Sequence, residues 1–154
     1  MTQHRTARRA LVILDVFAGV AALTGGTMAL TGLLYRAPLE WLDGTPFSDY
    51  TVPGLILGVL VGGSALVAAG ATIRSAAAGA FASVAAGVLM MGWIVGEYIL
   101  VPAIRFNFAD IGASIQQVTW QQPLYFLIGL AMAVLALRIV PGGWRQLPRT
   151  AHLA

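Results

Sequence analysis

A chain of 154 residues in which 58% are apolar and only 10% are charged is not an ordinary soluble domain, because such domains carry roughly 25% charged residues. The mean hydropathy of +0.82 is typical of an integral membrane protein, and the lipid bilayer is therefore the predicted partner. The net charge of +3 reflects nine scattered arginines that mostly flank apolar segments, so we interpret them as topology signals and expect no nucleic-acid partner. The lack of cysteine excludes disulfide bonds and thiolate metal sites.

Four apolar runs are long enough to form helices that cross a bilayer, which takes about 20 residues each. Only Asp15 interrupts the first run. Pro53 and Pro123 stand where two helices begin, because the amide hydrogen that proline lacks has no partner in a first helical turn. We therefore predict an all-α integral membrane protein, a single domain with four transmembrane helices in an antiparallel bundle. The predicted spans are residues 10–34, 53–73, 76–100 and 123–140, and the outer loops are residues 35–52 and 101–122.

A cleaved signal peptide is the alternative interpretation of the first run, because Arg5, Arg8 and Arg9 precede it. The apolar core of a signal peptide is about 7 to 15 residues long and ends at a small-x-small cleavage site. The run at residues 10–34 is longer, includes Asp15 and has no clean site of that kind. We therefore favour a retained span.

The arginines also predict how the chain crosses the membrane, because basic residues near the ends of spans are retained in the cytoplasm. Arg36 and Arg105 fall on one side, and all other arginines fall on the side of the two termini. The prediction is a multi-pass protein of the cell inner (plasma) membrane with both termini in the cytoplasm.

The sequences of both outer loops predict ordered structure. Residues 37–50 interleave apolar side chains with Glu40, Asp43 and Asp49, which suits a segment in the headgroup zone. We interpret these acids as a solvated acidic face, because they lack the spacing of a calcium-binding loop. Residues 108–120 carry apolar side chains at helical spacing, so we predict a short amphipathic helix before the fourth span.

Small residues recur at intervals of about four within the runs, as close helix packing in lipid requires. The short turn at Arg74 makes the second and third runs an antiparallel pair, and we expect their small faces to meet as a glycine zipper. The same faces would also serve contact with a second copy or with another membrane protein. The predicted helix-packing residues are Gly54, Gly58, Gly62, Gly79, Ser83 and Gly87.

Asp15 is the first of two acids inside the predicted spans, where a charge is costly unless it is paired or hydrated. It shares a helical strip with Ala18 and is therefore expected to face other helices. A structural ion pair with Arg74 or Arg138 is one interpretation, and a proton- or ligand-binding role is the alternative.

Glu97 is the second acid, near the outer end of the third span. An ion pair with Arg36 or Arg105 is the structural interpretation. The alternative is a ligand-binding site that opens outward and includes Trp93 and Tyr98. At a rise of about 1.5 Å per residue the two acids lie roughly 20 Å apart along the membrane normal, so we expect two separate sites.

The sequence offers no constellation of catalytic residues, and we predict no cofactor and no metal. His4 and His152 lie near the ends of the chain, outside the predicted spans, where they cannot ligate a haem within the membrane. HExxH and similar metal-binding spacings are absent. These observations favour a protein that is not an enzyme.

Three stretches of the sequence resemble a family of small four-span membrane proteins from high-GC bacteria, and the activity of that family is not established. The stretches are residues 44–69, 92–100 and 120–138, and their marks are the motifs PFxDYTxPGL and QPLYFxxGL. The resemblance implies the same four-span topology and supplies no catalytic residues. The general layout is also similar to that of DoxX-like membrane proteins.

Three functions are compatible with these features. The first is a non-enzymatic accessory or assembly protein that packs against itself, another membrane protein or lipids, because glycine-rich faces abound and buried polarity is scarce. The second is a carrier or binding protein for a small molecule, lipid or ion that uses Glu97 and Asp15, and as a carrier it needs a polar path between them. The third is a membrane enzyme or quinone-binding redox subunit.

Overall fold

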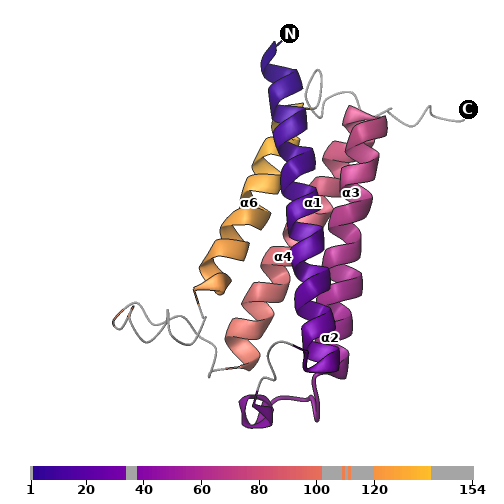
Figure 1. Cartoon of the computed structure of the whole chain (residues 1–154). Helices are drawn as coiled ribbons and strands as arrows, with labels where there is room; N and C mark the ends of the chain where they lie inside the picture. Colours follow the sequence, from indigo (N-terminus) through magenta and orange to yellow (C-terminus); the bar gives the residue numbers. More distant parts are fainter. Residues whose placement is uncertain (1, 34–37, 102–108, 110, 112–119, 140–154) are drawn as a thin grey trace, which may run out of the picture.

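The computed structural model describes residues 2–33, 38–101, 109, 111 and 120–139, and these residues form helices and short connections (Figure 1). Predictions for Arg36, Arg105 and most of residues 108–120 lie outside the described residues. The elements are α1 (Thr2–Thr31), the 3₁₀ turn η1 (Leu39–Leu42), α2 (Thr51–Leu55), the π-helix η2 (Ile56–Gly62), α3 (Gly63–Arg74), α4 (Ala76–Leu100) and α6 (Gln121–Ile139).

Four helices are long and apolar enough to cross a membrane, as the sequence predicts. The segments α2, η2 and α3 follow one another without a break and form the second of them. Three of the four predicted spans match within two residues at each end, whereas α1 begins at Thr2 rather than near residue 10 and ends at Thr31. Pro53 and Pro123 both lie in first helical turns, where their missing amide hydrogens cost no helix hydrogen bond.

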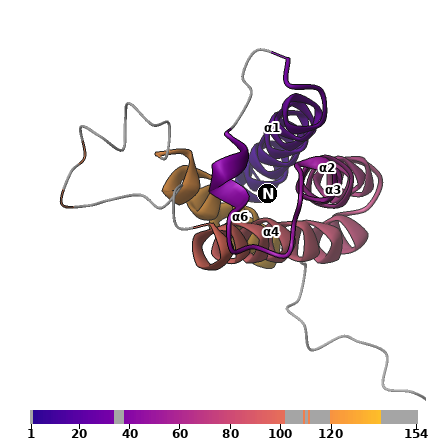
Figure 2. The ribbon, with the colours of Figure 1, turned by 90° about the horizontal axis from the view of Figure 1, so that it is seen from below.

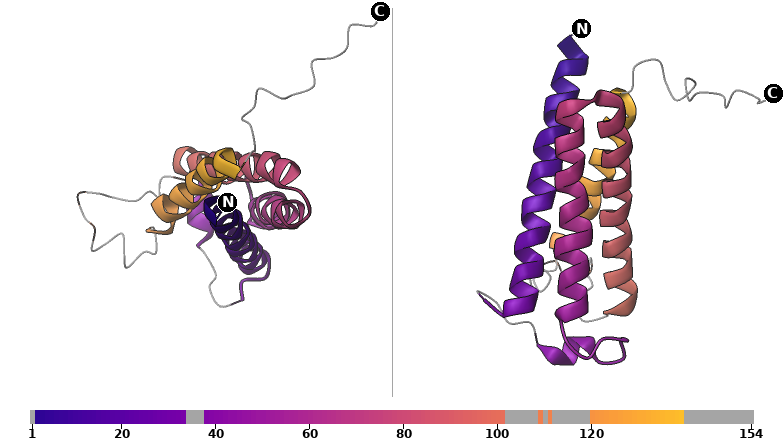
Figure 3. Two further views of the ribbon diagram at one scale, coloured as in Figure 1. Left: turned by 90° about the horizontal axis from the view of Figure 1, so that it is seen from above. Right: turned by 90° about the vertical axis from the view of Figure 1, so that its right-hand side faces the viewer.

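The long helices lie side by side in a ring in which each packs mainly against two neighbours (Figures 1 and 3). Helix α4 packs between α3 and α6, and α1 closes the ring against the second span and α6. The buried centre consists mainly of small residues, whereas large apolar side chains such as Ile13, Val67 and Phe81 are exposed on the outside. We call the end of the ring at Thr31 and Leu100 the loop end and the opposite end, with Arg8 and Arg74, the arginine end.

Helix α1 and the second span approach through glycines. A Cβ atom added to Gly26 would lie 2.6 Å from the carbonyl oxygen of Gly54 and 2.6 Å from the amide nitrogen of Gly58. Further along, a Cβ atom on Gly62 would lie 3.0 Å from the carbonyl oxygen of Gly19. These glycines therefore set the separation of the two backbones, as small residues do in membrane helix pairs.

The prediction that the small faces of the second and third spans meet is wrong for the glycines of the second span and for Gly87. Gly87 of the third span lies against Gly129 of α6, and a Cβ atom on it would lie 2.5 Å from the Gly129 carbonyl oxygen. Gly79 and Ser83 of the third span do meet the second span, where both contact Thr72. The ring places α1, not α4, against the glycines of the second span, and adjacency in sequence could not reveal this.

The arginine end is held by side chains that satisfy helix carbonyls. Arg8 donates from Nε to the carbonyl oxygen of Thr72 and from Nη2 to that of Ile73, each at 2.9 Å. Ser75 is the N-cap of α4, and its hydroxyl group accepts a hydrogen bond from the amide of Ala78 at 3.4 Å. Because the last carbonyls of a helix have no partner within it, Arg8 both caps α3 and fixes α1 beside the turn.

Candidate functional site

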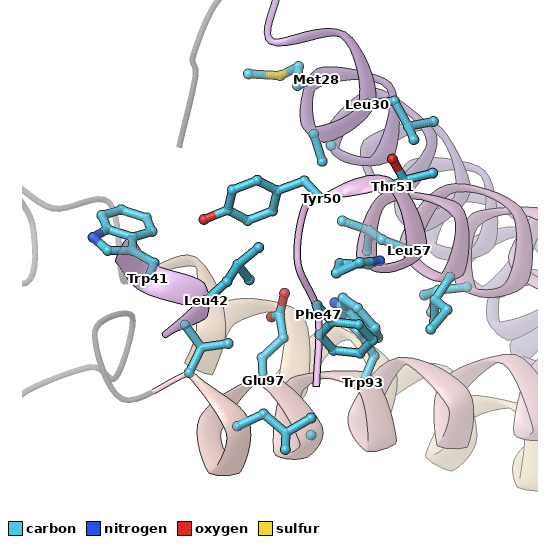
Figure 4. A pocket seen from close by; sticks show the side chains of 18 of the residues that line it. Met28, Leu30, Trp41, Leu42, Phe47, Tyr50, Thr51, Leu57, Trp93 and Glu97 are labelled. Atoms are coloured by element: carbon cyan, nitrogen blue, oxygen red, sulfur yellow. The ribbon is translucent and has the colours of Figure 1, made fainter. Parts of the chain in front are cut away.

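A cavity of about 1610 Å³ lies at the loop end, between the helices and the first loop (Figure 4). Its walls come from the end of α1, the first loop, α2 and η2, the last turns of α4 and the start of α6. A deeper cavity of about 140 Å³ adjoins it and is lined by residues of all four long helices. Residues that line both cavities include Gly25, Leu57, Trp93, Glu97 and Tyr125.

Glu97 is the polar centre of this region. Its side chain points into the cavity, which Leu42 and Phe47 of the first loop also line (Figure 4). The side chains of Gln122 and Trp93 hydrogen-bond to its carboxyl group. The predicted ion pair with Arg36 or Arg105 falls outside the described residues, and the polar partners that the structure shows are an amide and an indole.

Helical spacing explains how these side chains converge. Trp93 and Glu97 are four residues apart on α4 and therefore lie on one face, one turn above the other. Gln122 and Tyr125 are three residues apart in the first two turns of α6, and both line the deeper cavity. Helix α6 packs along α4, so the two faces meet at the loop end.

One polar atom of this cluster is unsatisfied. The Oε1 atom of Gln122 is buried and has no hydrogen-bond partner within the described part of the chain. Since a buried oxygen without a partner costs free energy, it marks a place where a hydrogen-bond donor would be stabilised.

The first loop crosses the loop end of the helices (Figure 2), and several of its residues line the larger cavity. Leu42 of η1 is buried, and the hydroxyl group of Tyr50 donates to the carbonyl oxygen of Pro38 at 2.7 Å. Trp41, Phe47 and Tyr50 all line the cavity. The aromatic side chains of residues 37–50, predicted to lie in the headgroup zone, thus also form a wall of the site.

The charged side chains among the described lining residues are all acidic. Glu40 and Asp49 of the first loop line the larger cavity together with Glu97, and no described lining residue is basic. The backbone amide of Thr51 donates to Asp49 Oδ1 at 2.8 Å, and this bond holds the pKa of the Asp49 carboxyl below its usual range. Asp49 is therefore ionised at neutral pH.

The π-helix η2 forms part of the same wall. Ile56, Leu57, Leu60 and Val61 lie within this seven-residue segment and line the larger cavity. The side-chain pattern of the sequence did not distinguish a π-helix from an α-helix. Such wide turns are found frequently at functional sites, which agrees with the position of η2 beside the cavity.

Asp15 belongs to a different place near the arginine end. It is 0% exposed, and Ser83 Oγ donates to its Oδ2 at 2.7 Å, while Ser83 and Thr72 hydroxyls lie 3.4 Å apart. No ion pair joins Asp15 to Arg74 or Arg138 in the part of the chain that the structure describes; Arg74 instead donates to the Gly70 carbonyl oxygen at 3.3 Å. The structure therefore replaces the predicted arginine partner with a serine.

Apolar side chains separate the two acids. Between Asp15 and the cavities, α1 contributes Ala18, and between Ser83 and Glu97 the third span contributes Ala86 and Met90, all of them buried in the core. The described residues thus provide no polar path along the ring from one acid to the other.

Of the four residues predicted to bind a ligand, Trp93 and Glu97 come together at the cavity. Asp15 is elsewhere, and Tyr98 does not line either cavity. Sequence reasoning missed Gln122, which lies one residue before the predicted start of the fourth span and belongs to α6 in the structure. It also missed the aromatic wall formed by Trp41, Phe47, Tyr50 and Tyr125.

Comparison with known proteins adds no assignment: no protein-family model, no curated protein and no solved structure matches the chain. The resemblance to four-span proteins of high-GC bacteria therefore stays a prediction. Among the described residues, no group of three or more histidines and acids is placed to hold a metal ion.

Proposed function

We propose that this protein is a four-helix membrane bundle that binds an amphiphilic small molecule in the cavity at its loop end. The cavity carries this proposal, because it combines mostly apolar walls with a few convergent polar groups around Glu97, the usual make-up of a small-molecule site. An apolar body would lie against the aliphatic and aromatic walls, and a polar head would reach Glu97 and Gln122.

In this proposal the four helices cross the plasma membrane in alternating directions, and both termini lie in the cytoplasm. Exposed apolar side chains on all four helices support contact with lipid. The basic residues Arg8, Arg74 and Arg138 lie toward one end of the helices, whereas the acids of the first loop lie at the other. The cavity then faces the outside of the cell.

Two observations favour binding over the other functions. The glycine faces that suggested assembly with a partner are largely used within the chain, where Gly26, Gly58, Gly87 and Gly129 bring its own helices together. A carrier that links Glu97 to Asp15 needs a polar path, and apolar core residues fill the space between them. We therefore propose a binding site that opens at one end.

Native mass spectrometry of protein transferred from its own membrane into nanodiscs tests this proposal. We expect the wild-type protein to retain a reproducible extra mass. Gly96→Trp should lose that mass, because Gly96 lines the larger cavity and a Cβ atom there meets no atom within 4 Å, so the indole would occupy the part of the cavity next to Glu97.

The matched control is Gly63→Trp, whose Cβ atom also meets no atom within 4 Å but which does not line either cavity. It should retain the extra mass. A wild-type spectrum without any adduct, or equal retention by both tryptophan variants, would contradict the proposed site.

A further inference from the structure

The polar and aromatic groups in the walls of both cavities favour a positively charged ligand. We propose that the site selects a hydrophobic cation, an amine whose ammonium group lies against Glu97 and whose apolar body fills the larger cavity. This inference rests on the proposed binding function and adds the chemistry of the ligand.

The hydrogen-bonding groups of the deeper cavity support the ammonium group. The nitrogen donors of Gln122 and Trp93 are directed to the Glu97 carboxyl, and Gln122 Oε1 is left buried without a partner. The polar group still unsatisfied is thus an acceptor next to a carboxyl. An ammonium group consists only of donors and has a positive charge, so it suits both groups.

Aromatic side chains add a second preference for positive charge. Trp93 and Tyr125 line both cavities beside Glu97, and Trp41, Phe47 and Tyr50 line the larger one. The faces of aromatic rings carry negative electrostatic potential and attract cations, and recognition of ammonium groups by several aromatic rings follows from this.

The acids of the first loop extend the same bias to the mouth. Glu40 and Asp49 line the larger cavity, and Asp49 is ionised at neutral pH because its carboxyl accepts a hydrogen bond from Thr51. Because no described lining residue is basic, these acids give the cavity a negative electrostatic potential, which concentrates cations and repels anions.

The sizes of the cavities agree with a small head and a larger apolar body. The deeper cavity measures about 140 Å³. A cavity of about 150 Å³ can hold benzene, so an ammonium group with its first carbons has room there. Leu57, Leu60, Val88 and Leu89 are among the apolar residues of the adjoining larger cavity.

The absence of native cysteine allows a direct test at one introduced thiol. In a Gly96→Cys variant the thiol lies next to Glu97 in the wall of the larger cavity. Its thiolate attacks a methanethiosulfonate reagent, forms a mixed disulfide and releases methanesulfinate. The cationic trimethylammonium-ethyl reagent and the anionic sulfonato-ethyl reagent are compared, and each rate is divided by the rate of the same reagent with 2-mercaptoethanol.

We expect the corrected rate of the cationic reagent to exceed that of the anionic reagent by about 10-fold or more at low salt, within the range that focused fields produce. The ratio should fall as salt is added and should fall several-fold further in the Gly96→Cys, Glu97→Gln variant. In addition, 4-phenylbutylammonium should slow the labelling, whereas 4-phenylbutanol at equal concentration should slow it much less. Ser48→Cys, exposed on the first loop and outside both cavities, should be labelled without protection by either probe.

The outcomes separate this inference from the function on which it rests. A ratio near one, with equal protection by the amine and the alcohol, would overturn the selection of cations and leave amphiphile binding intact. No reaction of Gly96→Cys with either reagent would show that the cavity is closed and would overturn both. If Glu97→Gln prevents folding, the salt dependence of the rates and the protection by the two probes in Gly96→Cys alone still test the selection of cations.

Discussion

Gly87→Leu is expected to lower the free energy of unfolding by about 3 kcal/mol or more, the upper end of the range for overpacking. A Cβ atom on Gly87 would lie 2.5 Å from the carbonyl oxygen of Gly129, and one on Gly129 would lie 2.8 Å from that of Gly87. The obstacle is backbone and cannot move aside as a side chain does. Helices α4 and α6 must therefore separate, which removes the contacts that hold α6 in the ring.

Gly92→Leu provides the matched control on the same helix. A Cβ atom at Gly92 meets no atom within 4 Å, so the added side chain occupies open space. The change in stability should stay within about 1 kcal/mol, because leucine is a better helix former than glycine by roughly that amount. Titration with sodium dodecyl sulfate in mixed micelles, followed by circular dichroism, measures both variants. Equal stabilities would show that α4 and α6 do not pack at Gly87.

Ser83→Ala is the second substitution for which we expect a large effect, a loss of about 1 to 2 kcal/mol. Hydrogen bonds between membrane helices average about 0.6 kcal/mol and reach about 1.7 kcal/mol. We expect the upper end here, because Ser83 Oγ donates at 2.7 Å to a fully buried carboxyl whose other oxygen has no described partner. Without the serine, neither oxygen of Asp15 would be satisfied.

A double-mutant cycle isolates this hydrogen bond from the packing of the serine. In an Asp15→Ala background, Ser83→Ala should change the free energy of unfolding by less than about 0.5 kcal/mol, because the acceptor is gone. If Ser83→Ala costs the same with and without Asp15, the contact contributes nothing and the stability of this region has another source. The same detergent titration provides all four values.

The spans were predictable because hydropathy and proline position are local properties of the sequence. Residues 76–100 match α4 at both ends, and the second and fourth spans deviate by at most two residues. The partners of the glycines were not predictable, because they depend on which helices become neighbours in the ring. Gly54 and Gly58 belong to the second span, and their contact with Gly26 joins segments that the sequence separates by a loop.

The candidate site was predictable only on one helix. The four-residue spacing of Trp93 and Glu97 indicated a shared face, and the structure places both at the cavity. Gln122 and Tyr125 enter the site because α6 packs along α4, and Tyr50 enters it because the first loop covers the loop end. These contributions are tertiary, so no local pattern could assign them.

The π-helix η2 also escaped prediction, for a different reason. A π-helix differs from an α-helix in its backbone hydrogen bonds, and the apolar run from Ile56 to Gly62 is compatible with either.

The partner of Asp15 was also not predictable. A serine takes the place of the expected arginine because Ser83 is buried at the same level of the ring, whereas Arg74 is exposed.

The most direct test of the proposed site is the modification of its carboxyl group by dicyclohexylcarbodiimide, an apolar reagent that adds to protonated carboxyl groups within membranes. Peptide mass mapping of the wild-type protein, treated at acidic pH so that its carboxyl groups are protonated, should find the adduct on Glu97, which lines both cavities, and none on Asp15, which is 0% exposed. Gly96→Trp should block the modification of Glu97. An unmodified Glu97, or an adduct on Asp15 in its place, would contradict a ligand-accessible cavity at the loop end.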